Sequence, residues 1–140
     1  MWISRDKIRF SLLEEGEDYF AHEDEVFSIF TTAINSALKA PDIENIYIDA
    51  THLNHSSRTK TRSHITEWKY IDEYNIILFR VPESVCQERN AMRTGRELVP
   101  AEALHNMYKR YTMPKWENYH RIFTVNENNE MEEVNDLSLF

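Results

Sequence analysis

The sequence predicts an α/β fold with a mostly parallel sheet, and three observations favour it. Short apolar runs at residues 46–49, 75–80 and 121–126 have the length of buried strands. Segments with helical spacing of apolar residues separate these runs. No internal repeat or low-complexity segment interrupts the alternation. Because strands that alternate with helices favour βα units, we expect a three-layer arrangement in which helices cover both faces of the mostly parallel sheet.

The amino-terminal half predicts two strands and three helices. A strand ends near Ser4, and a short helix follows with Asp6 in its first turn, where the helix dipole favours a carboxylate. Residues 22–39 form the clearest predicted helix, since their apolar positions recur every three or four residues. After the strand at residues 46–49, a helix is expected over residues 56–68, because serine is a favourable N-cap.

The carboxyl-terminal half predicts two more helices between two strands. A helix begins at Pro82, since proline suits a first helical turn, and ends near Met92. A glycine-containing loop at residues 94–97 precedes the next helix, which Pro114 ends. We expect a domain over residues 1–126 and an acidic tail over residues 127–140, either a weak edge strand or frayed.

The charge of the chain is unevenly distributed. Its 140 residues carry a formal net charge of −8, from 24 acidic and 16 basic residues. Residues 14–25 hold seven acids and residues 127–136 hold five, and neither stretch contains Lys or Arg. The remainder therefore has 12 acids against 16 bases, a balance of about +4. An anionic ligand is compatible with this balance; the alternative is that the bases lie on solvated helix faces.

Several classes of protein are excluded by residues that are missing. The single cysteine, Cys86, rules out an internal disulfide and favours a reducing cytoplasm. The residue six positions later is Met92, whereas a cysteine phosphatase loop requires an arginine there. With only Gly16 and Gly95, the sequence contains neither a GxxxxGKS/T phosphate loop nor a GxGxxG motif. No apolar run approaches the roughly 18 residues of a membrane span, so we expect no membrane partner.

Two carboxylates are the first candidates for chemistry. Asp6 and Asp49 each come directly after a predicted strand, so both are expected at the same edge of the sheet. One can serve as general base for a hydroxyl, while the other holds a metal or orients that hydroxyl. The alternative is that both acids only stabilise helix or turn ends.

Four arginines are the second set of candidates. Arg89, Arg93 and Arg96 span a helix end and a glycine loop, and Arg89 and Arg93 are expected on one helical face. Arginines in a loop suit the charge that spreads over a transferred phosphoryl group, although a solvated helix face has the same pattern. Arg9, one turn after Asp6, is placed to grip a substrate phosphate. The histidines lack a third ligand at a known spacing, so we predict no metal site formed by them.

Three motifs resemble P-loop kinases of the phage polynucleotide kinase type, whose ATP-binding domain is AAA-like. They are residues 3–9 (ISRDKIR), residues 47–54 (YIDATHLN) with Arg58, and residues 89–96 (RNAMRTGR) leading to Val99-Pro100. Their order and spacing are similar to those of that kinase domain from its second strand onward. The resemblance covers roughly residues 1–126, and it implies a P-loop NTPase-like sheet that is incomplete at its amino-terminal end.

The resemblance implies an acceptor site in the first half of the chain. Asp6 corresponds to the general base that takes the proton of a 5′-hydroxyl, and Arg9 to the arginine that holds the phosphate next to it. Asp49 and Thr51 correspond to the strand-end motif that helps form the acceptor site. The implied acceptor is a nucleic acid or a small hydroxylated compound.

The resemblance also implies a nucleotide partner, with ATP and Mg²⁺ as cofactors. Arg89 and Arg93 correspond to lid arginines that contact the donor phosphates, and Arg96 to a third. The family begins, however, with a strand, a phosphate loop and a helix that this sequence does not contain. That strand would lie centrally, between the strands at residues 46–49 and 75–80.

This departure leaves three expectations open. The chain is a cytoplasmic kinase domain truncated upstream of Met1 and inactive alone, or a non-catalytic phosphate-binding, nucleotide-binding or protein-interaction module derived from a kinase. A homo-oligomer that completes the sheet is compatible with either.

Overall fold

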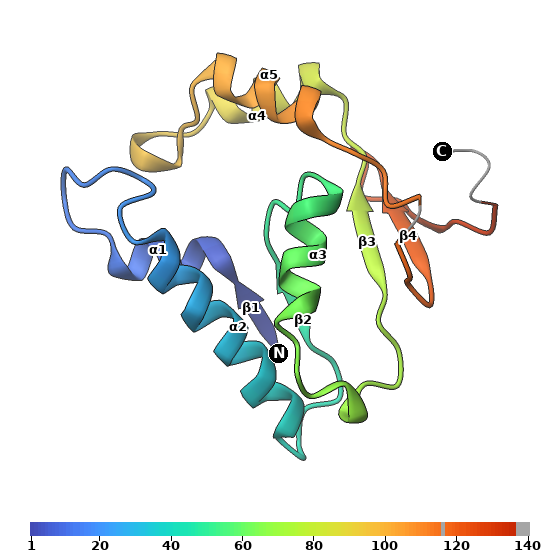
Figure 1. Ribbon diagram of the computed structural model, residues 1–140. Helices are drawn as coiled ribbons and strands as arrows, with labels where there is room; N and C mark the ends of the chain where they lie inside the picture. Colours follow the sequence, from blue (N-terminus) through green and yellow to red (C-terminus); the bar gives the residue numbers. More distant parts are fainter. Residues whose placement is uncertain (116, 137–140) are drawn as a thin grey trace. The chain divides into compact units, whose positions relative to one another are not determined.

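The computed structural model describes residues 1–115 and 117–136, and the chain divides into two compact units (Figure 1). The first unit comprises residues 1–52 and 56–72, and the second comprises residues 53–55 and the chain from residue 73 onward. No helix in the described ranges is long and apolar enough to cross a membrane. Each unit has its own strands, so each is described separately.

The first unit is built on two parallel strands. β1 (Trp2–Ser4) pairs with β2 (Tyr47–Asp49), with Ser4 opposite Asp49. α1 (Arg5–Leu12) follows β1 directly, and its N-cap Ser4 accepts a hydrogen bond from the backbone N–H of Lys7. α2 (Glu23–Lys39) packs against α1 and β1. Its fully buried side chains form the core of this unit: Val26, Phe30 and Ile34.

The third predicted helix is shorter than the sequence pattern indicates. α3 (His55–Ser63) ends five residues before the expected end at residue 68, and a separate 3₁₀ turn covers Trp68–Tyr70. The Asn35 side chain of α2 gives the physical reason. Its amide donates to the backbone carbonyl of His64 at 2.9 Å and its carbonyl accepts from the N–H of Thr66 at 2.9 Å. These bonds draw the chain off the helical path.

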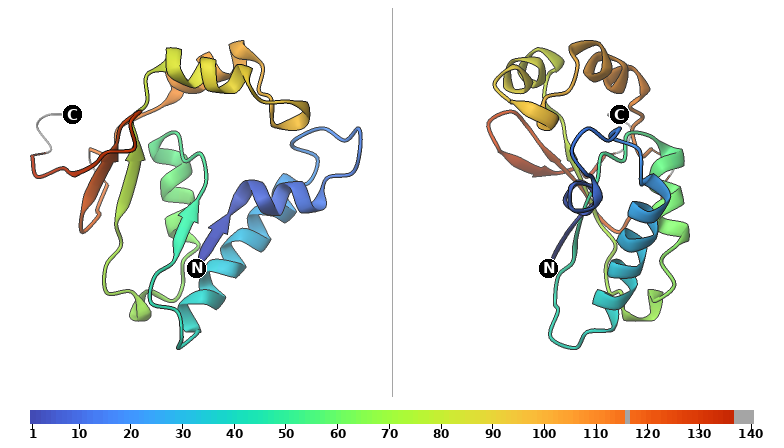
Figure 2. Two further views of the ribbon diagram at one scale, coloured as in Figure 1. Left: turned by 180° about the vertical axis from the view of Figure 1, so that it is seen from behind. Right: turned by 90° about the vertical axis from the view of Figure 1, so that its left-hand side faces the viewer.

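The second unit contains a three-stranded sheet. β3 (Ile76–Phe79) pairs in parallel with β4 (Ile122–Val125), and β5 (Met131–Glu133) pairs antiparallel with β4. Between β3 and β4 the chain forms α4 (Glu83–Ala91), a 3₁₀ turn at Gly95–Glu97 and α5 (Ala101–Arg110). Figure 2 shows the β4–β5 hairpin from two further sides.

The predicted fold class is confirmed: helices alternate with strands, and β1–β2 and β3–β4 are parallel pairs. Among the described residues, the strands form two sheets in which β2 pairs only with β1, and β3 only with β4. Of the two alternatives for the acidic tail, the structure shows an edge strand at β5. Residues 137–140 of the tail lie outside the described ranges.

Candidate functional site

The two candidate carboxylates lie where the sequence predicts, at the ends of neighbouring parallel strands. Asp6 is in the first turn of α1, two residues after β1 ends, and its side chain is 60% exposed. Asp49 ends β2 opposite Ser4, and its Oδ2 accepts a hydrogen bond from the Trp2 indole at 3.1 Å. Neither carboxylate bonds the other in the described chain, so Asp6 and Asp49 share an edge without direct contact.

Arg9 is the most heavily bonded side chain at this edge. Although charged, it is only 5% exposed. Its Nε and Nη2 donate to both carboxylate oxygens of Glu23 at 2.9–3.1 Å. Its Nη1 donates to Asp6 Oδ1 and, at 2.8 Å, to the Tyr19 hydroxyl. Every guanidinium donor therefore has a partner within the chain, as a buried charge requires.

Tyr19 connects Arg9 to Asp6. Its hydroxyl donates to Asp6 Oδ1 at 2.7 Å, and its ring lies 4.4 Å from the Arg9 guanidinium carbon, within cation–π range. Partial burial of the hydroxyl, together with its bond to the Asp6 carboxylate, raises the pKa of Tyr19 to about 12, although the residue as a whole is 36% exposed. At neutral pH the phenol therefore keeps its proton and donates it in a hydrogen bond to Asp6.

Sequence reasoning missed Tyr19 and Glu23. Both lie in or next to the acidic stretch at residues 14–25, which we interpreted only as a charge run and a helix start. One signal was present in the sequence: an acidic stretch without Lys or Arg follows Arg9 within a few residues. An arginine that folding buries needs a carboxylate partner, and this stretch could supply one.

The loop after β2 is held by residues of α3. His52 has a left-handed backbone (φ 41°), which is uncommon for a residue other than glycine. Arg58, 3% exposed, donates to the carbonyl of His52 at 2.9 Å, and the His52 ring bonds Thr61 Oγ1 at 2.9 Å. These bonds fix the loop that carries Thr51, whose own side chain is exposed.

The arginine segment of the second unit, residues 89–96, differs from its prediction in one respect. α4 ends at Ala91, so Arg93 lies beyond the helix and does not share a regular helical face with Arg89. Arg89 donates to the backbone carbonyl of Glu127 at 2.8 Å. Arg93 is exposed and has no side-chain hydrogen bond or ion pair in the described chain, and Arg96 is exposed within the 3₁₀ turn.

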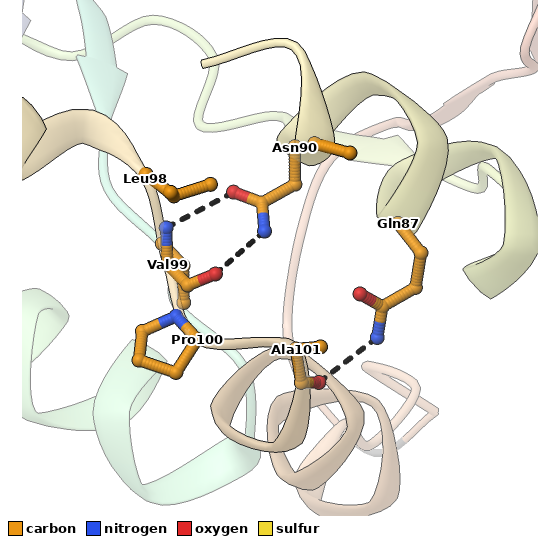
Figure 3. A pocket seen from close by; sticks show the side chains of 7 residues that line it. Gln87, Asn90, Leu98, Val99, Pro100 and Ala101 are labelled. Atoms are coloured by element: carbon orange, nitrogen blue, oxygen red, sulfur yellow. Dashed lines mark hydrogen bonds between the residues drawn. The ribbon is translucent and has the colours of Figure 1, made fainter. Parts of the chain in front are cut away.

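A buried asparagine closes the base of this arginine segment (Figure 3). Asn90, 6% exposed, donates from its amide to the carbonyl of Val99 at 2.6 Å and accepts from the N–H of Val99 at 3.0 Å. Nearby, Gln87 donates to the carbonyl of Ala101 at 2.9 Å. Asn90 thereby joins the two ends of the loop that presents Arg93 and Arg96.

The site residues thus fall into two groups. Asp6, Arg9, Asp49 and Thr51 belong to the first unit, whereas the three arginines at positions 89, 93 and 96 belong to the second. Among residues 1–115 and 117–136, no group of three or more His, Cys, Asp and Glu side chains could hold a metal ion.

Comparison with known proteins identifies one family. No curated protein and no solved structure matches the chain. A family model described as an AAA domain matches residues 2–114, well over half of the sequence. This family has a P-loop NTPase-like fold and includes kinase-like members. With parallel strands and a strand-end carboxylate already described, the chain belongs to the AAA domain family.

Proposed function

We propose that this chain carries the acceptor side of a nucleotide-dependent phosphotransferase, with Asp6 as the general base for a hydroxyl. One observation carries the proposal: Asp6 is an exposed carboxylate directly after β1, at the edge where Asp49 ends the neighbouring parallel strand. In α/β proteins, ligands bind outside the carboxyl ends of strands. Membership of a P-loop NTPase-like family supports the same assignment.

The bonds of Asp6 suit a general base. Arg9 and Tyr19 both bond the same oxygen, Oδ1. Oδ2 has no hydrogen-bond partner among the described residues, so it remains able to accept the proton of an incoming hydroxyl. The carboxylate is therefore fixed at one oxygen and accessible at the other.

The residues present do not form a complete site for ATP and Mg²⁺. The sequence contains no GxxxxGKS/T loop, whose backbone and lysine hold nucleotide phosphates. Arg93 and Arg96 are exposed and suited to contact phosphate oxygens, but arginines alone do not enclose them. ATP and Mg²⁺ thus remain proposed cofactors, and we derive no step through them.

Transfer from labelled ATP tests this function directly. The acceptors are a 5′-hydroxyl oligonucleotide and a panel of small hydroxylated compounds, and the proteins are the 140-residue chain and the native gene product. We expect no efficient transfer by the chain alone, because it lacks the phosphate loop.

In an active gene product, Asp6→Asn should slow transfer by about 10²–10⁴-fold. Asp24→Asn, which makes the same change at another exposed acid of the first unit, is the control. Equal activity of Asp6→Asn and Asp24→Asn would refute the role of Asp6.

A second candidate is a non-catalytic module that binds a nucleotide or another phosphate-bearing ligand. The absence of a phosphate-loop motif from the sequence favours it. This alternative predicts that calorimetry detects nucleotide binding by the gene product while labelled ATP gives no transfer to any acceptor. Turnover that depends on Asp6 would eliminate it.

Oligomerisation is compatible with both candidates. β2 and β3 each pair along one edge only in the described chain, and an unpaired strand edge is a template for another strand. A homo-oligomer that covers these edges predicts a mass above that of a monomer in light scattering. A monodisperse monomer of 16.8 kDa would argue against it.

A further inference from the structure

The guanidinium of Arg9 has no donor left for a ligand. Its five hydrogen bonds go to Glu23, Asp6 and Tyr19, all within the first unit. The side chain is 6% exposed, against 60% for its neighbour Asp6. An arginine that receives a substrate phosphate needs an open pair of N–H groups. Arg9 does not offer one.

Glu23 takes the position that such a phosphate would need. Arginine binds carboxylate and phosphate through the same fork, with two roughly parallel N–H bonds. Glu23 contacts Nε and Nη2 of Arg9 with both of its oxygens, which is this bidentate arrangement. The Glu23 carboxylate therefore stands in for the anion, and a phosphate could reach the fork only by displacing it.

Two further features hold Glu23 in place. It is the first residue of α2, where the helix dipole favours a carboxylate, and the buried side chains of Val26 and Phe30 anchor that helix. It also pairs with Arg5, so it bridges two guanidinium groups. Because this competitor is intramolecular, a free phosphate must overcome a high effective concentration of carboxylate.

We propose that Glu23 is a specificity-determining residue that closes Arg9 to phosphate, so that the acceptor is a small hydroxylated compound without a phosphate next to its hydroxyl. The part that concerns the acceptor rests on the function proposed above. The seven acids of residues 14–25 point the same way, since they repel a polyanion such as a nucleic acid. An uncharged or positively charged acceptor is compatible with Asp6 and with this acidic stretch.

The test is a titration of the ¹⁵N-labelled protein with inorganic phosphate, followed by NMR at the Nε–H signal of Arg9. The wild-type signal should not move, because Glu23 holds the fork. Glu23→Gln removes the competing charge, and its signal should shift saturably. The gain in phosphate affinity should be roughly ten- to a hundredfold, which corresponds to the free energy of a hydrogen bond to a charged group. Asp24→Asn removes the same charge at the next residue, which is exposed and unpaired in the described chain, and should behave like wild type.

Two results with the wild type and Glu23→Gln would overturn the proposal. One is a wild-type Arg9 signal that phosphate shifts as strongly as in Glu23→Gln. The other is a folded Glu23→Gln whose signal phosphate leaves unchanged. If Glu23→Gln does not fold, Glu23→Asp replaces it, since a shorter side chain loses the bidentate contact while keeping the charge. Its Arg9 signal should then show a weaker, saturable shift, and no shift would count against the proposal.

A comparison of acceptors separates this inference from the proposed function. Adenosine and adenosine 3′-monophosphate differ only in a phosphate near the ribose hydroxyls. If the active gene product prefers the monophosphate and Arg9→Lys removes that preference, the role of Glu23 is refuted while the kinase stands. If no acceptor is phosphorylated and yet Glu23→Gln gains phosphate affinity, the proposed function fails and the role of Glu23 stands.

Discussion

Two regions of this chain place arginines in or just after short helices, and the environments of these arginines differ. Arg9 lies within α1, whereas Arg89 lies within α4 and Arg93 and Arg96 come after that helix. Arg9 is buried with five internal hydrogen bonds, whereas Arg93 is exposed and unpaired in the described chain. The same type of side chain therefore forms internal bonds in one unit and lies exposed to solvent in the other. A buried guanidinium must satisfy its donors inside the protein, and an exposed one bonds water until a ligand arrives.

Arg9→Ala should give the largest loss of stability. Removing Arg9 leaves Glu23 and Arg5 without their third member and opens a cavity at a site that is 5% exposed. Breaking a buried ion pair by removing one member costs about 3 kcal/mol. Urea denaturation followed by circular dichroism measures the change. A loss of stability equal to that of Arg93→Ala would mean that the bonds of Arg9 contribute no more to stability than the exposed side chain of Arg93.

Asn90→Ala should give the next largest loss, because Asn90 joins the two ends of the exposed segment that carries Arg93 and Arg96. It removes both bonds to Val99 and leaves a backbone N–H and carbonyl without those partners. The expected loss is about 2 kcal/mol, with faster hydrogen exchange at the Val99 amide than in wild type. Gln87→Ala, which removes the single bond to the carbonyl of Ala101, is the matched control. Unchanged exchange at Val99 would show that Asn90 does not close the loop.

Tyr19→Phe should have a smaller effect that depends on pH. It removes the hydroxyl that bonds Asp6 and Arg9, at a cost of about 1 kcal/mol near neutral pH. The pKa of Tyr19 in the folded protein, about 12, lies above its ordinary value of 10.0. The stability from the neutral phenol is therefore complete below pH 10.0 and is lost as pH rises through about 12.

Alkaline denaturation of wild type and Tyr19→Phe measures this contribution, with tyrosinate absorbance as a second reading. The stability difference between the two proteins should shrink above pH 10. Tyr108 is present in both, so its own raised pKa cancels in the comparison. A difference that stays constant through the alkaline range would contradict the assignment of the shift to Tyr19.

Arg93→Ala should have the smallest effect on stability. The residue is exposed and makes no side-chain bond in the described chain, so the expected change is within about 0.5 kcal/mol. Its effect should appear instead in nucleotide binding by the native gene product, measured by calorimetry. A large loss of stability would remove the contrast with Arg9.

Much of the fold could be predicted from local patterns. The helix at residues 23–39 follows from apolar spacing, and the strand ends at Ser4 and Asp49 follow from short apolar runs. The end of α3 could not be predicted, because Asn35 of another helix decides it through bonds to His64 and Thr66. Such contacts join residues about thirty positions apart, and no local pattern encodes them.

The candidate site, like the fold, was predictable from the sequence only in part. The sequence alone determined that two carboxylates follow two strands and that a GxxxxGKS/T loop is absent from these 140 residues. It also supplied the resemblance of residues 89–96 to a kinase motif, which stays a prediction. Only the tertiary structure decided that the Glu23 carboxylate binds the Arg9 guanidinium and that the Tyr19 hydroxyl bonds Oδ1 of Asp6. The physical reason is that a charge forms its bonds with whatever partners folding brings near it. Those partners come from α2 and the stretch before it, fourteen and ten residues beyond Arg9.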